Sequence, residues 1–363
     1  MKVLLCGDIS PTSDNNHLFA QVETKTLFND VKQLFDAADV SIVNLECALT
    51  EAQTPISKIG PAIGAAPNTA KVLKELGVTY CNLSNNHFYD MGKQGVADSL
   101  AALDAAGLGY TGFGEDEADS QKNLVIELGG KTLCIIAVCE HEYSYALPDR
   151  MGTRAFDPFE TPLQVREAKE CYDRVAVIYH GGKEQCQYPS PRLLKACRAM
   201  AKSGADLILC QHSHCIGCYE EYEGCHIIYG QGNFHFVKEK YRDDPMWHKG
   251  LAVTYDTETT EFVMTPVVGT DVGIRLATEA EAARIMDEMA QRDQQLQDGT
   301  WQDGWHQFCV ERSELYLRTI CKAYNNVEGT EYSKERFAHY LDCEAHTDVW
   351  RELCKTYNIT TNK

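Results

Sequence analysis

Residues 207–214 read Leu-Ile-Leu-Cys-Gln-His-Ser-His, an apolar run followed at once by two histidines. An unbroken apolar run of this length predicts a strand that is buried on both faces, as in a parallel sheet. A helical pattern at 190–202 precedes it and opens on Ser190-Pro191, a typical N-cap and first turn. This stretch therefore predicts a helix and a buried strand that carries imidazole groups to the end of the sheet.

The same pattern recurs along the first three quarters of the chain. Further Val-, Ile- and Leu-rich runs predict buried strands at 3–6, 40–43, 78–83, 133–138, 175–179 and 226–229. Helical patterns at 68–76 and 95–106 lie between them, and each is followed by a glycine, the usual residue after a helix end. Alternating strands and helices predict an α/β domain over residues 1–275.

The pattern changes from residue 276 to residue 363. Charged, helical stretches at 279–297, 303–324 and 333–357 show no strand signal. We interpret them as a C-terminal helical extension, which packs against the core or forms the contact of a homo-oligomer.

Charge and hydropathy exclude several classes of partner. The 363 residues include 34 Lys and Arg against 53 Asp and Glu, a net charge of −19. Such a surface repels nucleic acid and anionic membranes, and no basic patch offsets it, so we expect no nucleic acid partner. No stretch is long enough for a membrane segment, and the apolar run after Lys2 is too short for a signal peptide. A cytoplasmic location is therefore expected.

The chain has sixteen cysteines. Several lie inside apolar runs, where a thiol behaves as a small buried hydrophobic group. A chain of this length folds without disulfides, so we expect reduced cysteines. The single Cys215-x-x-Cys218 pair lacks the second pair that a zinc ribbon needs.

Polar side chains follow six of the predicted strands. One such residue is usually a turn former or a helix cap, but the ends of parallel strands converge on one edge of a sheet, where ligands bind. Many desolvated polar groups side by side are costly unless they bind something, and a divalent cation fits them. Mixed oxygen and imidazole ligands favour Mn, Fe or Zn. The motifs are Gly7-Asp8, Asn44-Leu45-Glu46, Asn85-Asn86-His87 with Asp90, His180-Gly-Gly-Lys-Glu184, His212-Ser-His214 and Gly232-Asn233-Phe234.

This ordered set of motifs resembles the CapA-like poly-γ-glutamate and capsule biosynthesis family, a branch of the calcineurin-like metallophosphoesterases. The resemblance covers roughly residues 1–270 and leaves the helical extension outside it. It implies a four-layer αββα sandwich with one or two divalent metal ions at the edge of its two sheets.

The resemblance also implies roles for individual residues. Asp8 and His214 match ligands of a first metal, and Glu46 stands where the family has its bridging aspartate. His87 matches the histidine that contacts the phosphoryl group or protonates the leaving oxygen. The ligands implied for the second metal, beside Glu46, are Asn86, His180 and His212. Candidates for the substrate side or for supporting the ligands are Asn44, Asn85, Asp90, Glu184 and Asn233.

The chain departs from the family pattern in three places. Asp8-Ile9-Ser10 lacks the histidine of the usual Asp-x-His, which leaves the first site one ligand short: weak, vacant, or completed by a group such as Glu184. Gln211 replaces the usual glycine before the histidine pair, and Glu46 is one methylene longer than aspartate. The second site has all its ligands.

The expected function is metal-dependent hydrolysis of a phosphoester, on a small-molecule or polymer substrate of anionic character. The alternative is an accessory or polymer-handling protein of poly-γ-glutamate or capsule biosynthesis with little phosphoesterase activity, or one that hydrolyses the γ-glutamyl amide. A third interpretation is a metal-free protein whose site has decayed. The sequence has no Walker loop and no Gly-x-Ser-x-Gly elbow, which argues against an NTPase and a serine hydrolase.

Overall fold

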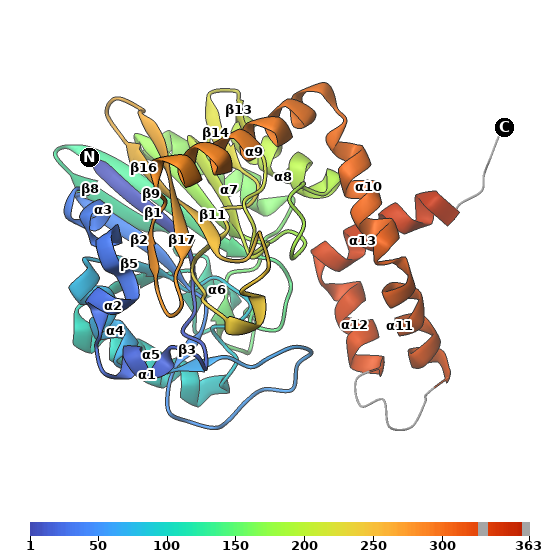
Figure 1. Ribbon diagram of the computed structural model, residues 1–363, viewed down its shortest axis with the longest axis horizontal. Helices are drawn as coiled ribbons and strands as arrows, with labels where there is room; N and C mark the ends of the chain where they lie inside the picture. The colour runs from blue at the N-terminus through green and yellow to red at the C-terminus, as the bar shows by residue number, and fades with distance from the viewer. Residues whose placement is uncertain (326–332, 358–363) are drawn as a thin grey trace.

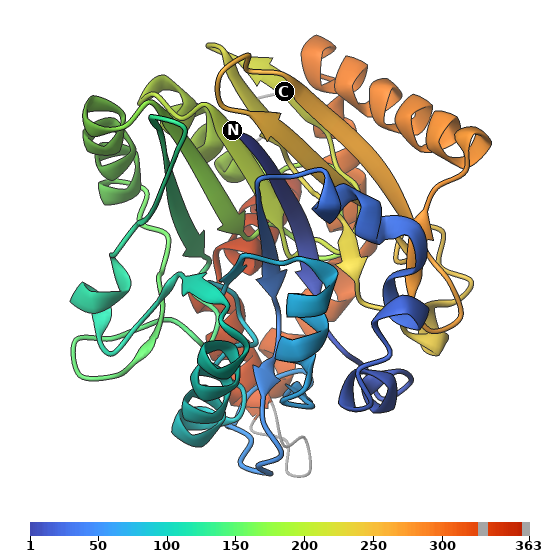
Figure 2. The same cartoon turned by 90° about the vertical axis from the view of Figure 1, so that its left-hand side faces the viewer.

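The computed structural model describes residues 1–325 and 333–357, and its body consists of two facing β-sheets with helices on their outer faces (Figures 1 and 2). Alternate residues of a strand point to opposite faces of a sheet. Leu4 of the first strand therefore packs against the outer helices, whereas Leu5 packs between the sheets with Ile178. The four-layer αββα sandwich expected from the sequence is confirmed.

The first sheet has eight strands in the order β18-β17-β16-β1-β2-β5-β6, with β15 paired to β1. β1, β2, β5, β6 and β15 run parallel, whereas β16 to β18 form an antiparallel flank that the sequence analysis did not predict. The strands are β1 (Lys2–Ile9), β2 (Val40–Leu45), β5 (Tyr80–Asn82), β6 (Gly109–Thr111), β15 (Asn233–His235), β16 (Lys249–Asp256), β17 (Phe262–Gly269) and β18 (Ile274–Leu276).

The second sheet has six strands in the order β13-β14-β12-β11-β9-β8. Its four central strands are parallel, and β8 and β13 are antiparallel edges. The strands are β8 (Leu124–Leu128), β9 (Lys131–Cys139), β11 (Arg174–His180), β12 (Leu207–Gln211), β13 (Tyr219–Tyr222) and β14 (Cys225–Ile228). Short pairs outside the two sheets are β3 (Ala48–Leu49) with β4 (Gly64–Ala65), and β7 (Phe113–Gly114) with β10 (Gly152–Thr153).

The helices of the body cover the outer face of each sheet. Ser190 caps α8 by accepting a hydrogen bond from the Leu193 amide, as its sequence predicts, and Gly77 and Gly107 follow α4 and α5 in the left-handed conformation. The helices over the first sheet are α1 (Asn16–Ala20), α2 (Thr24–Phe28), α3 (Lys32–Asp36), α4 (Thr69–Leu76) and α5 (Gly92–Ala106). Those over the second sheet are α7 (Glu160–Cys171) and α8 (Pro191–Lys202), and the short helical turns are η1 (Asn29–Val31), α6 (Glu117–Ser120) and η2 (Glu239–Tyr241).

The C-terminal region is helical, as expected, and α10 to α13 project to one side of the sandwich (Figure 1). The stretches 303–324 and 333–357 each form two helices rather than one, because the chain turns at Arg312 and Cys343. These turns bring Tyr316 against Trp350 at a ring distance of 5.1 Å. The helices are α9 (Glu279–Asp298), α10 (Trp301–Glu311), α11 (Ser313–Asn325), α12 (Ser333–Asp342) and α13 (Glu344–Tyr357).

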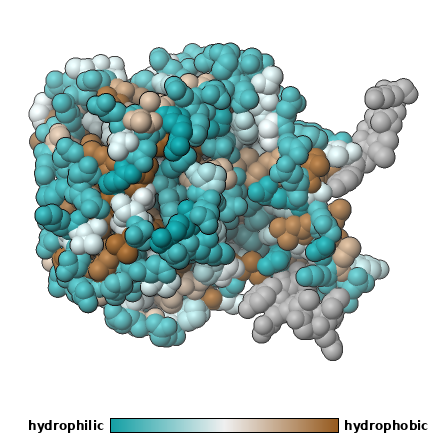
Figure 3. All heavy atoms as spheres, viewed as in Figure 1, coloured by the Kyte–Doolittle hydropathy of each residue, from teal (hydrophilic) through white to brown (hydrophobic). Residues whose placement is uncertain are grey.

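The surface of these helices carries apolar side chains, visible in brown in Figure 3. Among the described residues, five of the eleven large exposed hydrophobic side chains lie on α11 and α12: Leu315, Leu317, Ile320, Tyr324 and Leu341. The homo-oligomer contact and the division into residues 1–275 and 276–363 stay predictions. All sixteen cysteines are free. Within 1–325 and 333–357, no helix combines the length and apolar character that crossing a membrane requires.

Candidate metal centre

The residues proposed from the sequence as ligands gather at one edge of the two sheets. Asp8 lies near the end of β1, Glu46 directly follows β2, and His180 ends β11 in the opposite sheet. All three side chains are buried. The close approach of two strands requires a glycine beside Asp8, because a Cβ on Gly7 would lie 2.6 Å from the Gly232 carbonyl oxygen.

One group of ligands consists of Glu46, His180 and His212, whose candidate ligand atoms all lie within 4.8 Å of one another. His180 Nε2 is 3.5 Å from a Glu46 oxygen and 3.0 Å from Asn86 Oδ1. The structure therefore brings together all four residues that the resemblance assigns to the second metal.

A second group consists of Asp8, Glu46 and His214, again with ligand atoms within 4.8 Å of one another. His214 Nδ1 lies 3.7 Å from Asp8 and 2.9 Å from Asn233 Oδ1. Glu46 belongs to both groups, so its carboxylate lies where the two sets of candidate ligand atoms meet.

The two histidines after β12 adopt an unusual backbone conformation. His212 and His214 have φ values of 76° and 55°, in the left-handed region that side chains other than glycine rarely adopt. Such conformations persist where surrounding structure enforces them, and they cluster at functional sites. Here the strained turn brings both imidazoles close to the buried Glu46 carboxylate.

The Glu46 carboxylate lacks partners of its own. Both of its oxygens are buried, and neither has a hydrogen-bond donor within residues 1–325 and 333–357. Burial, reinforced by the negative charge of Asp8, raises the pKa of Glu46 to about 8. A buried carboxylate without donors is costly, and a cation removes that cost.

The histidines also fit a divalent cation. Burial lowers the pKa of His180 to about 4 and that of His212 to about 3, which keeps a ring lone pair free for a metal. Burial would also lower the pKa of His214, but the carboxyl groups of Glu46 and Asp8 raise it overall. The residues present therefore fit one or two divalent ions.

Asparagine side chains support this arrangement from within the first sheet. The Asn44 amide donates to Asp8 Oδ1 at 2.7 Å and lies 3.1 Å from His180 Nδ1, so it joins the two sheets. Asn85 donates to the Asn44 side-chain oxygen at 3.1 Å and accepts from the His87 amide at 3.1 Å. Asn44 thus holds Asp8 and His180 by hydrogen bonds, and Asn85 in turn holds Asn44.

His87 lies beside the centre in a hydrogen-bonded group of its own. Its Nδ1 is 2.6 Å from Asp90, and the Lys58 ammonium is 2.6 Å from the other oxygen of that carboxylate. Burial would raise the pKa of Asp90, but His87 and Lys58 outweigh burial and lower it. A charged Asp90 orients the imidazole and leaves its Nε2 available for another partner.

Two residues expected near the first site have different surroundings. Glu184 is exposed and belongs to neither group of ligand atoms among the described residues, so completion of the first site by Glu184 stays a prediction. Ser10 stands where the family has its histidine, and its buried hydroxyl has no hydrogen-bond partner in the described part of the chain.

The sequence analysis missed Lys58 and Glu142. Glu142 lies 3.5 Å from His212 Nε2 and 3.1 Å from His339 Nε2 of α12. Glu142 follows β9, so the strand-end pattern used for the other residues would have found it. Lys58 lies in a long loop, where no pattern in the sequence marks it.

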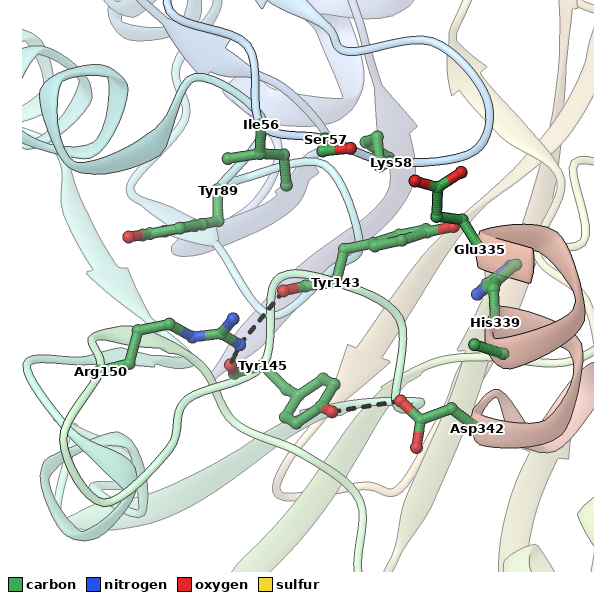
Figure 4. Close-up of a pocket in the computed structure, with 11 residues that line it drawn as sticks. Ile56, Ser57, Lys58, Tyr89, Tyr143, Tyr145, Arg150, Glu335, His339 and Asp342 are labelled. Carbon is green, nitrogen blue, oxygen red and sulfur yellow. Dashed lines mark hydrogen bonds between the residues drawn. The ribbon is translucent and has the colours of Figure 1, made fainter. Parts of the chain in front are cut away.

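A cavity of about 470 Å³ opens beside Lys58 (Figure 4). The loop around Lys58, the segment from Tyr143 to Arg150, and α12 form its walls. Two of its lining residues contact groups beside the proposed ligands. The Lys58 ammonium lies 3.4 Å from His87 Nδ1, and His339 contacts Glu142. Arg150 donates to the main-chain oxygens of Tyr143 and Tyr145 and pairs with no carboxylate in the described residues. The cavity lining thus combines Lys58, Arg150 and three tyrosines on one side with the carboxylates of Glu335 and Asp342 of α12 on the other.

Two solved structures resemble this chain at low sequence identity. A putative 5′-nucleotidase from Staphylococcus aureus is 14% identical with a TM-score of 0.45, and the match covers 80% of this chain and 58% of that one. A 5′-nucleotidase precursor from Thermus thermophilus is 14% identical with a TM-score of 0.44, over 82% and 59% of the two chains. Neither similarity carries an argument about activity.

Sequence comparison gives a clearer result. Bacillus subtilis PGA biosynthesis protein CapA is 30% identical over 63% of this chain and 62% of its own length. The capsule biosynthesis protein CapA of Bacillus anthracis is 31% identical over 48% of this chain and 44% of its own. The chain thus spans roughly half of these relatives. The model of the family described as bacterial capsule synthesis protein PGA_cap matches residues 2–238, and the chain belongs to that family.

Proposed function

We propose that this protein is a metal-dependent hydrolase that acts on a phosphoester. The supporting observation is the Glu46 carboxylate, which is buried, lacks hydrogen-bond donors in the described residues, and is shared by two groups of ligand atoms. Asp8, Glu46 and His214 would hold one ion, and Glu46, Asn86, His180 and His212 the other. When bound, such ions neutralise charge on a phosphoryl group and make a water acidic enough to attack it.

His87 acts on the substrate in this proposal. Asp90 holds its Nδ1, so its Nε2 is the nitrogen that contacts the phosphoryl group or donates a proton to the leaving oxygen. Lys58 keeps the Asp90 carboxylate charged, and that carboxylate orients the His87 imidazole. The neighbouring cavity, with Arg150 on its wall, would receive the anionic remainder of the substrate.

The test is hydrolysis of a panel of phosphomonoesters and phosphodiesters by protein loaded with Mn, Fe or Zn. We expect turnover that depends on the metal and that Glu46→Gln and His87→Asn remove. Glu127→Gln and His17→Asn alter exposed residues that belong to neither ligand group, and they serve as matched controls that keep activity. An inactive wild-type protein with full metal content would overturn the phosphoesterase proposal.

The second candidate is an accessory role in poly-γ-glutamate or capsule biosynthesis, with little phosphoesterase activity. The family match over residues 2–238 favours it. A form of this role is hydrolysis of γ-glutamyl amides, since an activated water also attacks carbonyl carbon. The same metal-loaded protein, incubated with γ-glutamyl oligomers, separates the two: amide cleavage or polymer binding without phosphoester turnover supports this candidate.

A further inference from the structure

A third group of potential metal ligands lies outside the centre described above, where the C-terminal helices meet the body. It consists of Glu142 after β9, Cys343 between α12 and α13, and His346 in the first turn of α13. Their candidate ligand atoms lie within 4.8 Å of one another. All three residues are largely shielded from solvent: Cys343 is 1% exposed and His346 8%, and the Glu142 side chain is 12% exposed.

His346 is oriented as a metal-ligating histidine is. The Tyr316 hydroxyl lies 2.6 Å from its Nδ1, and the Tyr340 ring stacks on it at a centroid distance of 3.9 Å. A hydrogen bond to one ring nitrogen fixes the ring and leaves the other nitrogen for the metal. Tyr316 and Tyr340 come from α11 and α12, so three helices together position this imidazole.

The other two ligands differ in the contacts that they already make. The nearest hydrogen-bonding atom to the Cys343 sulfur is a Glu140 oxygen at 4.0 Å, which is a weak contact. Glu142 is approached by His339 Nε2 at 3.1 Å, and His339 lies four residues before Cys343, one helical turn away. Lys183 contributes positive charge near His346, and the carboxylates of Glu142, Glu140 and Glu344 contribute negative charge near Cys343.

We propose that Glu142, Cys343 and His346 bind a third divalent cation of the zinc class. Thiolate, imidazole and carboxylate are the donor types of protein zinc sites, with bonds of about 2.0–2.3 Å that a small contraction of this group would provide. The thiol proton leaves to solvent when the sulfur binds. One thiolate and one carboxylate neutralise the charge of the ion, which lowers the free-energy cost of burying it.

Such an ion would connect the helical extension to the catalytic side of the molecule. It would tie α12 and α13 to the segment after β9, and α12 supplies Glu335, His339 and Asp342 to the cavity wall in Figure 4. Glu142 is also the residue that contacts His212. The third site therefore fixes one wall of the cavity, and it does so whether or not the protein hydrolyses phosphoesters.

The two proposals are separable because only the third site contains a sulfur ligand. We would titrate metal-free, full-length protein with Co²⁺ and record its absorption. We expect a near-ultraviolet thiolate-to-cobalt charge-transfer band that added Zn²⁺ removes. Cys343→Ser should abolish the band and lower the bound metal by one equivalent, and His346→Gln should weaken cobalt binding by about tenfold or more.

Glu46→Gln should keep the band while metal at the sheet edge is lost, so failure of the proposed function leaves this test intact. Cys354→Ser, which changes an exposed thiol on the same helix, is the matched control and should also keep it. Wild-type protein saturated with Co²⁺ but without the band would overturn the proposal, even if Cys343→Ser did not fold. A band that persists in folded Cys343→Ser would overturn it as well.

Discussion

The edge of the two sheets and the C-terminal helices both collect histidines and carboxylates, but the sequence displays them very differently. At the sheet edge, Asp8, Glu46 and His180 come directly at strand ends, and parallel strands bring those ends together. In the helices, His339, Cys343 and His346 meet Glu142 only because the chain turns at Cys343 and folds back. Topology places the first set, whereas tertiary packing places the second.

This contrast leads us to expect the largest effects at the sheet edge. Glu46→Gln should remove a ligand shared by both groups and lower kcat/KM by about 10³-fold or more, equivalent to several kcal/mol of transition-state stabilisation. Steady-state kinetics and elemental analysis of the same preparation check this. Retention of both metal and activity would show that the buried carboxylate is not the bridging ligand.

His87→Asn should have the next largest effect. Loss of a general acid costs about 10²–10⁴-fold in rate, and metal content should not change because His87 is not in either ligand group. A substrate whose leaving group needs no proton, such as a nitrophenyl ester, should be less affected than an alkyl ester. Equal losses on both substrates would contradict a role in protonating the leaving oxygen.

Glu142→Gln tests the link between the two regions. Since Glu142 contacts His212 and His339, its loss should weaken metal affinity at the sheet edge by about tenfold, a typical effect of a group that supports a ligand. Saturating metal should restore most of kcat, and hydrogen exchange in α12 should increase. Unchanged hydrogen exchange in α12 would show that the C-terminal helices are not coupled to the metal centre.

The smallest effect concerns stability without metal. Because the fold raises the pKa of Glu46 from its usual 4.5 to about 8, the folded chain keeps a proton that the unfolded chain loses. The free energy of unfolding therefore falls as pH rises from 4.5 to about 8. Glu46→Gln removes this pH-dependent loss of stability. At pH 8 the substitution should raise Tm by roughly 2–4 °C for each kcal/mol of unfolding free energy that it restores.

The comparison is thermal unfolding of metal-free wild type and variant at pH 5 and pH 8. We expect nearly equal Tm values at pH 5 and a more stable variant at pH 8. With metal added, the order should reverse, because only wild type gains the binding energy. A variant that is less stable at pH 8 without metal would contradict the absence of donors around Glu46.

The sequence predicted much of the fold because unbroken apolar runs such as 207–210 mark strands buried on both faces. It missed β16 to β18, where apolar and polar residues mix, as at Thr254 and Thr265 in paired strands. Helical periodicity predicted the C-terminal helices but did not predict the turns at Arg312 and Cys343. Lys58 was not predictable, because only the folded loop brings it to Asp90.

The most direct test of the account is anomalous diffraction from crystals of manganese-loaded protein. We predict an anomalous peak between Glu46, Asn86, His180 and His212, and a second peak on the side of Glu46 that faces Asp8 and His214. A structure at saturating manganese with no anomalous density within coordination distance of Glu46 would contradict the proposed metal centre.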